Sequence, residues 1–276
     1  MFSRLIVVLV MPLMVIAGSA RSADIAADLV EALQLREAFG VMAAEGEAYG
    51  REIETEMFPG AGGSAWAASV AQIYAVESIL PQFTAAFSSD LARSKSDASA
   101  ALGFFQSDLG RRVTTLEVSA RRALLDETVE DASRLKLEEM QAARDPRLEL
   151  IEEFVSVNDL VEANVTGALN ASYAFYLGLA EAGAFGGRTD QEGMLGDVWA
   201  QEPSIRHETD SWIHSYLVMA YAPLSDDDLK EYIAFSRTDA GRDLNRALFY
   251  GFDTVFVDVS RKLGRAAGRI LAGRDL

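Results

Sequence analysis

The stretch SDDDLKEYIAFSRTDAGR, residues 225–242, contains two helix starts in quick succession. Ser225 followed three residues later by Asp228 is typical of a capping box, in which each side chain bonds the backbone N–H of the other residue. Thr238 can cap the next helix, and the aspartate after it places a negative charge in the first turn, where it suits the helix dipole. The segment therefore predicts a short helix that ends near Phe235, a tight turn and a second helix.

A degenerate copy of this segment lies in the first half of the chain. FFQSDLGR, residues 104–111, aligns without gaps with FSRTDAGR, residues 235–242, and residues 35–38 resemble residues 160–163. Glycine inside a helix costs roughly 1 kcal/mol relative to alanine, so its presence in both copies predicts a close contact between helices. The pattern indicates an internal duplication with a structural motif, not a catalytic one. The residues of this motif are Ser94, Asp97, Phe104, Ser107 and Gly110 in the first half and Ser225, Asp228, Phe235, Thr238 and Gly241 in the second.

The rest of the chain also has the pattern of helices. Apolar residues recur at spacings of three and four, and glycine or proline follows most of these runs. Residues 255–259 have a strand-like composition, but their helical surroundings favour a buried helix face. Helices are expected over residues 24–58, 64–91 with a kink near Pro81, 97–106, 108–144, 147–184, 203–221, 226–237 and 239–272.

These helices predict an all-α fold. We expect two tandem, related helical bundles of about four helices each, over residues 24–145 and 146–276. The two bundles should pack into one compact or bilobed body.

The segment from residue 225 to 242 also carries a family resemblance. With its flanks, over about residues 216–265, it resembles the domain of unknown function 2059 family, and the first half resembles it only as a degenerate copy. One departure is Asp239, which stands where that family often has proline. The resemblance implies a helical bacterial protein of the periplasm or the medium. It implies no activity and no catalytic residues.

The N-terminus has the layout of a secretory signal peptide. Residues 1–20 combine a positive start, an apolar run and small residues before a cut after Ala20. The alternative is an uncleaved N-terminal anchor. We therefore expect a periplasmic or secreted protein that is not integral to the membrane after cleavage.

Composition excludes several kinds of chemistry. The chain has no cysteine, which excludes disulfides, thiolate catalysis and cysteine-ligated metals. It carries 42 acidic and 25 basic residues, for a net charge of −17. Such a charge repels phosphate backbones, so nucleic acid is not an expected partner.

The histidines offer the only candidate for catalysis or metal binding. His207, Asp210 and His214 can share one helix face, and nitrogen and oxygen ligands on one face could hold a metal. However, seven residues of helix separate the two histidines by about 10 Å, which is far for a single ion. We therefore predict no catalytic residues, no metal site and no cofactor.

Three hypotheses for function follow. The first is a non-enzymatic interaction or ligand-binding module of the cell envelope, with a protein or a small hydrophobic molecule as its partner. The second is a carrier whose hydrophobic ligand occupies a pocket between helices, beneath the aromatic residues of the second half. The third is a hydrolase or metal-binding protein that uses His207, Asp210 and His214.

Overall fold

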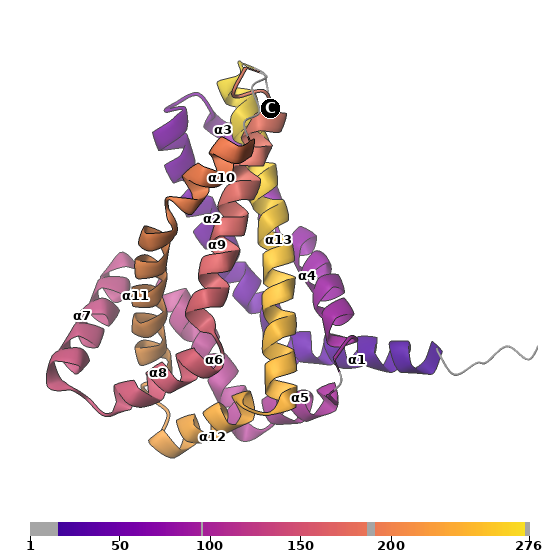
Figure 1. Ribbon diagram of the computed structural model, residues 1–276, viewed down its shortest axis with the longest axis vertical. Coiled ribbons are helices and arrows are strands. Elements are labelled where there is room, and N and C mark those ends of the chain that lie inside the picture. Colours follow the sequence, from indigo (N-terminus) through magenta and orange to yellow (C-terminus); the bar gives the residue numbers. More distant parts are fainter. Residues whose placement is uncertain (1–15, 95, 187–190, 274–276) are drawn as a thin grey trace, which may run out of the picture.

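Helices are the only regular secondary structure over the residues that the computed structural model describes, which are 16–94, 96–186 and 191–273. The all-α prediction is confirmed, including a helix through residues 255–259 (Figure 1). The helices are α1 (Ile16–Ala32), α2 (Leu35–Met57), α3 (Gly63–Ile73), α4 (Val76–Leu91), α5 (Ala98–Phe105), α6 (Asp108–Ala123), α7 (Glu127–Ala143), α8 (Arg147–Val157), α9 (Leu160–Glu181), α10 (Gln191–Trp199), α11 (Glu202–Tyr221), α12 (Asp226–Ser236) and α13 (Asp239–Leu271).

The first long helix predicted in each half is wrong, because each is two helices. Gln34, between α1 and α2, adopts a left-handed conformation with φ 49°, and Asp159, between α8 and α9, does the same with φ 51°. A left-handed residue breaks the helical ladder. The Gln34 side chain donates a 3.0 Å hydrogen bond to Thr115 Oγ1, which ties this break to α6.

Two further predicted helices also divide. Residues 64–91 break at Tyr74 and Ala75, ahead of the proline expected to kink them, and Pro81 lies within α4. Residues 108–144 break after α6, and Asp126 caps α7 by accepting a hydrogen bond from the backbone of Thr128. The estimate of about four helices per half was therefore too low.

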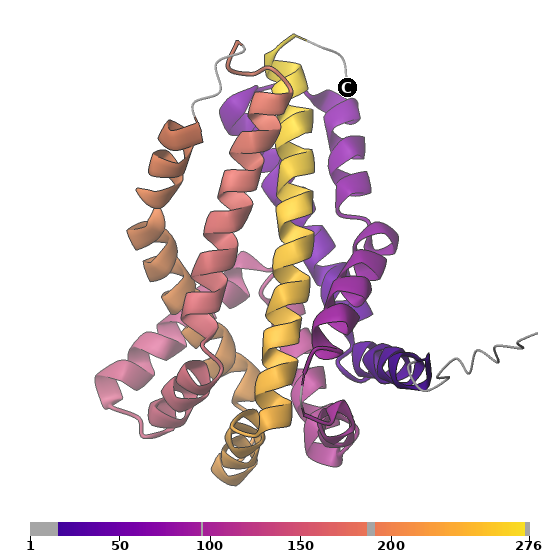
Figure 2. The ribbon, with the colours of Figure 1, turned by 45° about the vertical axis from the view of Figure 1, so that its right-hand side comes forward.

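The helices of both halves form one body around one core. Figures 1 and 2 show α9 and α13 running side by side in the same direction along its long axis. The other side of α13 packs on α4, and α11 packs on α6 and α7. A continuous cluster of buried side chains joins residues 24–145 to residues 146–276.

Glycines bring α9 and α13 unusually close. A Cβ atom at Gly178 would lie less than 3.0 Å from the Arg261 carbonyl oxygen, and one at Gly264 would lie as close to that of Phe175. Gly268, one turn later, faces the Ala182 side chain. Gly264 and Gly268 of α13 therefore serve an internal contact between helices.

The two junctions that resemble each other in sequence have the same local structure. Ser225 and Asp228 form the expected capping box at the start of α12. Ser107 caps α6 and Thr238 caps α13, each by accepting a hydrogen bond from the glycine three residues later. Gly110 and Gly241 are buried against the preceding helix, where a Cβ atom would lie less than 3.0 Å from the carbonyl oxygens of Phe104 and Phe235.

Ser94 and Asp97 occupy the motif positions of Ser225 and Asp228, which predicts a second capping box, and this prediction is wrong. Asp97 is itself the N-cap of α5 and accepts a hydrogen bond from the backbone of Ser99. Ser94 instead accepts a 2.7 Å hydrogen bond from Arg246 of α13. A contact from the other half of the chain thus determines its role.

Phe104 and Phe235 stack on each other. Their ring centroids are 4.0 Å apart and their planes differ by 5°, and both side chains are half-buried. Tyr232 also stacks with Phe104, at a ring-centroid distance of 5.6 Å. The two residues that align in the sequence therefore meet where α5 and α12 come together.

The predicted leader, residues 1–20, lies for the most part outside the described residues, and α1 begins at Ile16. Among the helices of the described segments, none combines the length and the hydrophobicity that crossing a bilayer requires.

Candidate ligand-binding groove

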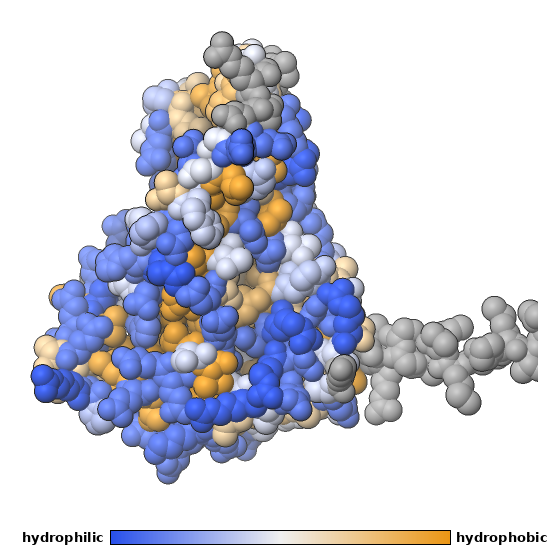
Figure 3. Space-filling model, viewed as in Figure 1, coloured by the Kyte–Doolittle hydropathy of each residue, from blue (hydrophilic) through white to orange (hydrophobic). Residues whose placement is uncertain are grey.

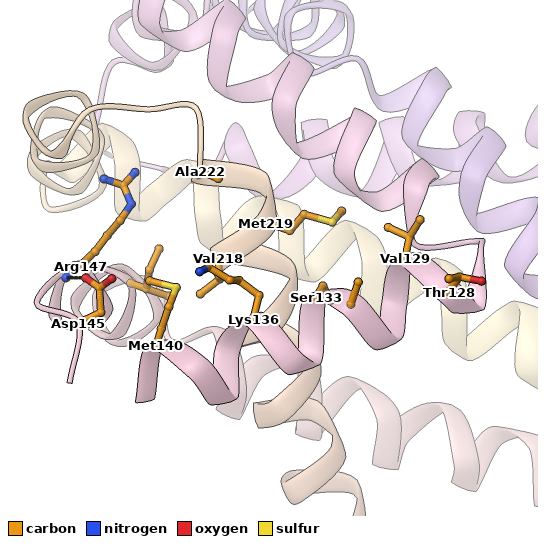
Figure 4. Close-up of a pocket in the computed structure, with 12 residues that line it drawn as sticks. Thr128, Val129, Ser133, Lys136, Met140, Asp145, Arg147, Val218, Met219 and Ala222 are labelled. Atoms are coloured by element: carbon orange, nitrogen blue, oxygen red, sulfur yellow. Dashed lines mark hydrogen bonds between the residues drawn. The ribbon is translucent and has the colours of Figure 1, made fainter. Parts of the chain in front are cut away.

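An apolar groove of about 630 Å³ lies between α7, α8 and α11. Figure 4 shows Thr128, Val129, Ser133, Lys136 and Met140 projecting from one side of α7 toward α11. The facing wall consists of Ile151 of α8 and of Val218, Met219 and Ala222, at the end of α11. In Figure 3, apolar patches interrupt a mostly hydrophilic face of the body, several of them over the end where these helices lie.

The groove exists because α7 folds back onto α11. Asp126 caps its first turn, and Arg144, with φ 51°, ends it. The apolar residues of α7 that face the groove follow helical spacing, as expected for a helix that buries one side. Its outer side is charged and solvated.

Three charged residues line the groove. The Arg147 guanidinium donates 2.7 Å hydrogen bonds to the carbonyl oxygens of Tyr221 and Leu224 and pairs with Asp226. Asp145 accepts a 2.9 Å hydrogen bond from the Arg147 backbone. Lys136 lies 3.4 Å from Glu139, and both of these side chains are mostly exposed. Arg147 and Asp145 thus make part-buried hydrogen bonds within the protein, whereas the ion pair of the Lys136 ammonium is exposed.

His207, Asp210 and His214 do not form a site. His214 Nδ1 lies 2.8 Å from the Asp210 carbonyl oxygen and 3.5 Å from its carboxylate. His207 is exposed and lines a separate surface cavity that neither of the other two residues lines. No group of three or more potential metal ligands occurs in the part of the chain that the structure describes.

The described aromatic residues of the second half lie in several different surroundings. Tyr221, Tyr232 and Phe154 are buried around one another, and most of the others pack against the core from partly buried positions. Phe175 and Tyr176 of α9 line a second groove, of about 620 Å³, against α2. The groove at α7 has no aromatic residue among its described lining residues, so its position differs from that of the predicted pocket.

The structure contains a partly buried carboxylate, Glu117, that was not predicted from the sequence. Glu117 of α6 accepts a 2.6 Å hydrogen bond from the Tyr221 hydroxyl and a longer one, 3.4 Å, from that of Tyr232. The Tyr216 hydroxyl donates to the Glu117 backbone carbonyl at 3.1 Å. Burial raises the pKa of Glu117 to about 7, and the tyrosine hydrogen bonds only partly offset this effect.

A second charged group lies one turn further along α6. Arg121 makes a bidentate ion pair with Glu45 of α2, with distances of 2.9 and 2.8 Å. Its guanidinium also lies 5.5 Å from the ring of Trp212, which stacks on Tyr216. These contacts join α2, α6 and α11, and each polar group in them has a partner.

Searches of protein-family models, of curated proteins and of solved structures find no match to this chain. The resemblance to the domain of unknown function 2059 family therefore stays a prediction.

Proposed function

We propose that this protein is an exported, non-enzymatic ligand-binding module whose ligand occupies the groove between α7, α8 and α11. The single observation that carries the proposal is the groove itself. Its volume of about 630 Å³ falls in the range of small-molecule sites, and its walls are mostly aliphatic. An apolar ligand gains about 0.8 kcal/mol for each methylene group that it buries.

The hydrogen bonding of the buried polar side chains is consistent with a ligand that is recognised by apolar contact. Within the described segments, no buried side-chain nitrogen or oxygen lacks a hydrogen-bond partner. A ligand in the groove therefore finds no buried side-chain donor or acceptor, among the described residues, that needs a hydrogen bond from it. Its affinity would come chiefly from burial against the walls, with Lys136 as the accessible charge.

Filling the groove should abolish binding. Ala132 lines the groove and is exposed, so Ala132→Trp places a large ring in the space without burying it in the core. We expect the variant to lose binding of a neutral naphthylamine fluorophore at least about tenfold, given that a side chain of this size displaces much of the ligand's contact area. Fluorescence titration measures this directly.

The matched control is Gln141→Trp, an exposed position of α7 outside the groove lining. It should bind as the wild type does. Equal binding by the wild type and Ala132→Trp, with both folded by circular dichroism, would contradict the proposal, as would the absence of any binding to the wild type.

We also propose that the protein reaches the periplasm or the medium through cleavage of residues 1–20. The charge and length of the leader support this, as does the resemblance to a family of exported proteins. When the full chain is expressed in a Gram-negative bacterium, the intact mass of the extracytoplasmic protein should correspond to a chain that starts at Arg21. Recovery of the uncleaved chain in the membrane fraction would favour the anchor instead.

We also propose that the fold arose by an internal duplication. Two features that the halves share support it. Left-handed Gln34 and Asp159 precede the similar residues 35–38 and 160–163, and a hydroxyl side chain caps the helix that follows Phe104 and the one that follows Phe235. Under this proposal α1–α6 correspond to α8–α13 in order, and α7 is a connecting addition. An experimental structure in which these sets superpose only in another order would contradict it.

A further inference from the structure

The charged residues that line the groove include two cations, although the protein as a whole is acidic. The chain has 42 acidic and 25 basic residues, yet the groove is lined by two cations, Lys136 and Arg147, and one carboxylate, Asp145. Charged residues that line an apolar site select ligands by complementarity of charge. Because Asp226 pairs with Arg147 and Glu139 pairs with Lys136, selection of a ligand by charge depends on which of these groups the ligand can reach.

The three charges are not equally available to a ligand. Arg147 is held by two backbone carbonyls and Asp226, and Asp145 by the Arg147 backbone. Lys136 has only an exposed ion pair of 3.4 Å with Glu139, and such pairs contribute little. Its ammonium group can thus exchange Glu139 for a ligand anion at small cost.

The position of Lys136 places a charge beside the apolar walls. It lies between Ser133 and Met140 on the groove side of α7, opposite Val218 of α11 (Figure 4). Lysine commonly lays its methylene stem along apolar surface and keeps its ammonium in water. A ligand with an apolar chain and one terminal anion would meet both features together.

We propose that the groove binds a long-chain carboxylate, with its alkyl chain between α7 and α11 and its carboxylate paired with Lys136. This inference rests on the proposed function, because it specifies the ligand of the same groove. Charge complementarity distinguishes a carboxylate from a neutral or a cationic amphiphile of equal chain length.

The test compares three ligands of one chain length on the full mature protein: hexadecanoate, hexadecanol and hexadecyltrimethylammonium. Each ligand is titrated against the bound neutral naphthylamine fluorophore, at ligand concentrations below those at which the ligand aggregates, and displacement of the fluorophore gives its affinity. We expect hexadecanoate to bind about fivefold more tightly than hexadecanol, as one partly exposed ion pair allows, and the cationic amphiphile to bind most weakly.

Lys136→Gln should bring hexadecanoate to the affinity of hexadecanol and leave hexadecanol unchanged. The control is Lys262→Gln on α13, which also removes a half-exposed lysine from an ion pair on one helix but lies outside the groove. It should change neither affinity. High salt should reduce the advantage of hexadecanoate in the wild type and in Lys262→Gln, and should have no such effect in Lys136→Gln.

The outcomes separate the two proposals. If hexadecanol binds as tightly as hexadecanoate, and Ala132→Trp abolishes both, the groove binds ligand but the carboxylate inference is overturned. If Lys136→Gln and Lys262→Gln lower the affinity for hexadecanoate equally, the effect is one of net charge and the inference is again overturned. If no amphiphile binds, or if Ala132→Trp has no effect, both proposals fail.

Discussion

Gly264→Ala is expected to destabilise the protein by about 3 kcal/mol, because the new methyl group would overlap atoms of the neighbouring helix. Its Cβ atom would lie less than 3.0 Å from the carbonyl oxygen of Phe175 and close to the backbone of Leu179. These are backbone atoms of α9, so no change of rotamer relieves the overlap. The helices must separate, which loosens the buried contacts that α9 and α13 make along their length. The cost should exceed the gain of roughly 1 kcal/mol that alanine brings to a helix interior.

Gly167→Ala is the matched control for this substitution. It makes the same chemical change in α9, where no atom lies within 4 Å of the added Cβ. Here only helix propensity acts, and the variant should be up to about 1 kcal/mol more stable than the wild type. Urea unfolding followed by circular dichroism measures both values. If the two variants shift the free energy of unfolding in the same direction, the close approach of α9 and α13 is not as described.

Sequence signals were sufficient where the relevant contacts are local. The capping box at Ser225 and Asp228 joins residues three apart, and α12 and α13 begin and end within a residue of the predicted positions. The breaks at Gln34 and Asp159 were missed because glutamine rarely adopts a left-handed conformation, and aspartate, although it does so more often, also occurs in regular helices. The role of Ser94 could not be predicted from local sequence either, because its hydrogen-bond partner, Arg246, belongs to the other half of the chain.

The groove could not be predicted for the same reason. The sequence predicts one helix over residues 108–144, and a continuous helix would carry residues 127–143 away from α11. The break at Leu124 to Asp126 instead turns α7 back on α11 and creates the apolar walls. Helix boundaries are the least certain part of such predictions, and here a boundary creates the site.

Glu117 did leave a signal in the sequence. On α6 it occupies the apolar stripe formed by Val113, Ala120 and Leu124, all of them buried. An acid within such a stripe is either paired or has a raised pKa, because burial disfavours its charged form. What the sequence did not show is the source of its partners, Tyr221 and Tyr232, which lie on two helices of the second half.

Glu117→Gln is expected to stabilise the protein at pH 8 and to have little effect near pH 4. Glutamine retains a carbonyl oxygen that can accept the Tyr221 hydrogen bond but carries no charge. In the folded wild type the pKa of Glu117 is raised from 4.5 to about 7, so between these two values the folded state holds a proton that the unfolded state has lost. The free energy of unfolding therefore falls as the pH rises through this window, by about 3 kcal/mol in all.

Other carboxylates act in the opposite direction, so the wild-type profile alone cannot isolate Glu117. Hydrogen bonds and ion pairs lower the pKa of Glu181, Asp228 and Asp243, and their contribution to stability is lost as the pH falls. The informative quantity is the difference in unfolding free energy between Glu117→Gln and the wild type, measured by urea unfolding from pH 4 to 8. Because the other groups are common to both proteins, their contributions cancel in this difference. It should rise with pH and level off above about pH 7.

Glu138→Gln corrects for the loss of one negative charge from an acidic protein, because Glu138 is exposed on the outer side of α7. Tyr221→Phe adds a second check on the cause. It removes the hydroxyl that donates to Glu117, and since that bond lowers the pKa of Glu117, its loss should extend the window to higher pH. If Glu117→Gln is instead less stable than the wild type at pH 8, the ionised carboxylate contributes favourably to the contact of α6 with α11 and α12. In that case its tyrosine hydrogen bonds outweigh the cost of burying its charge.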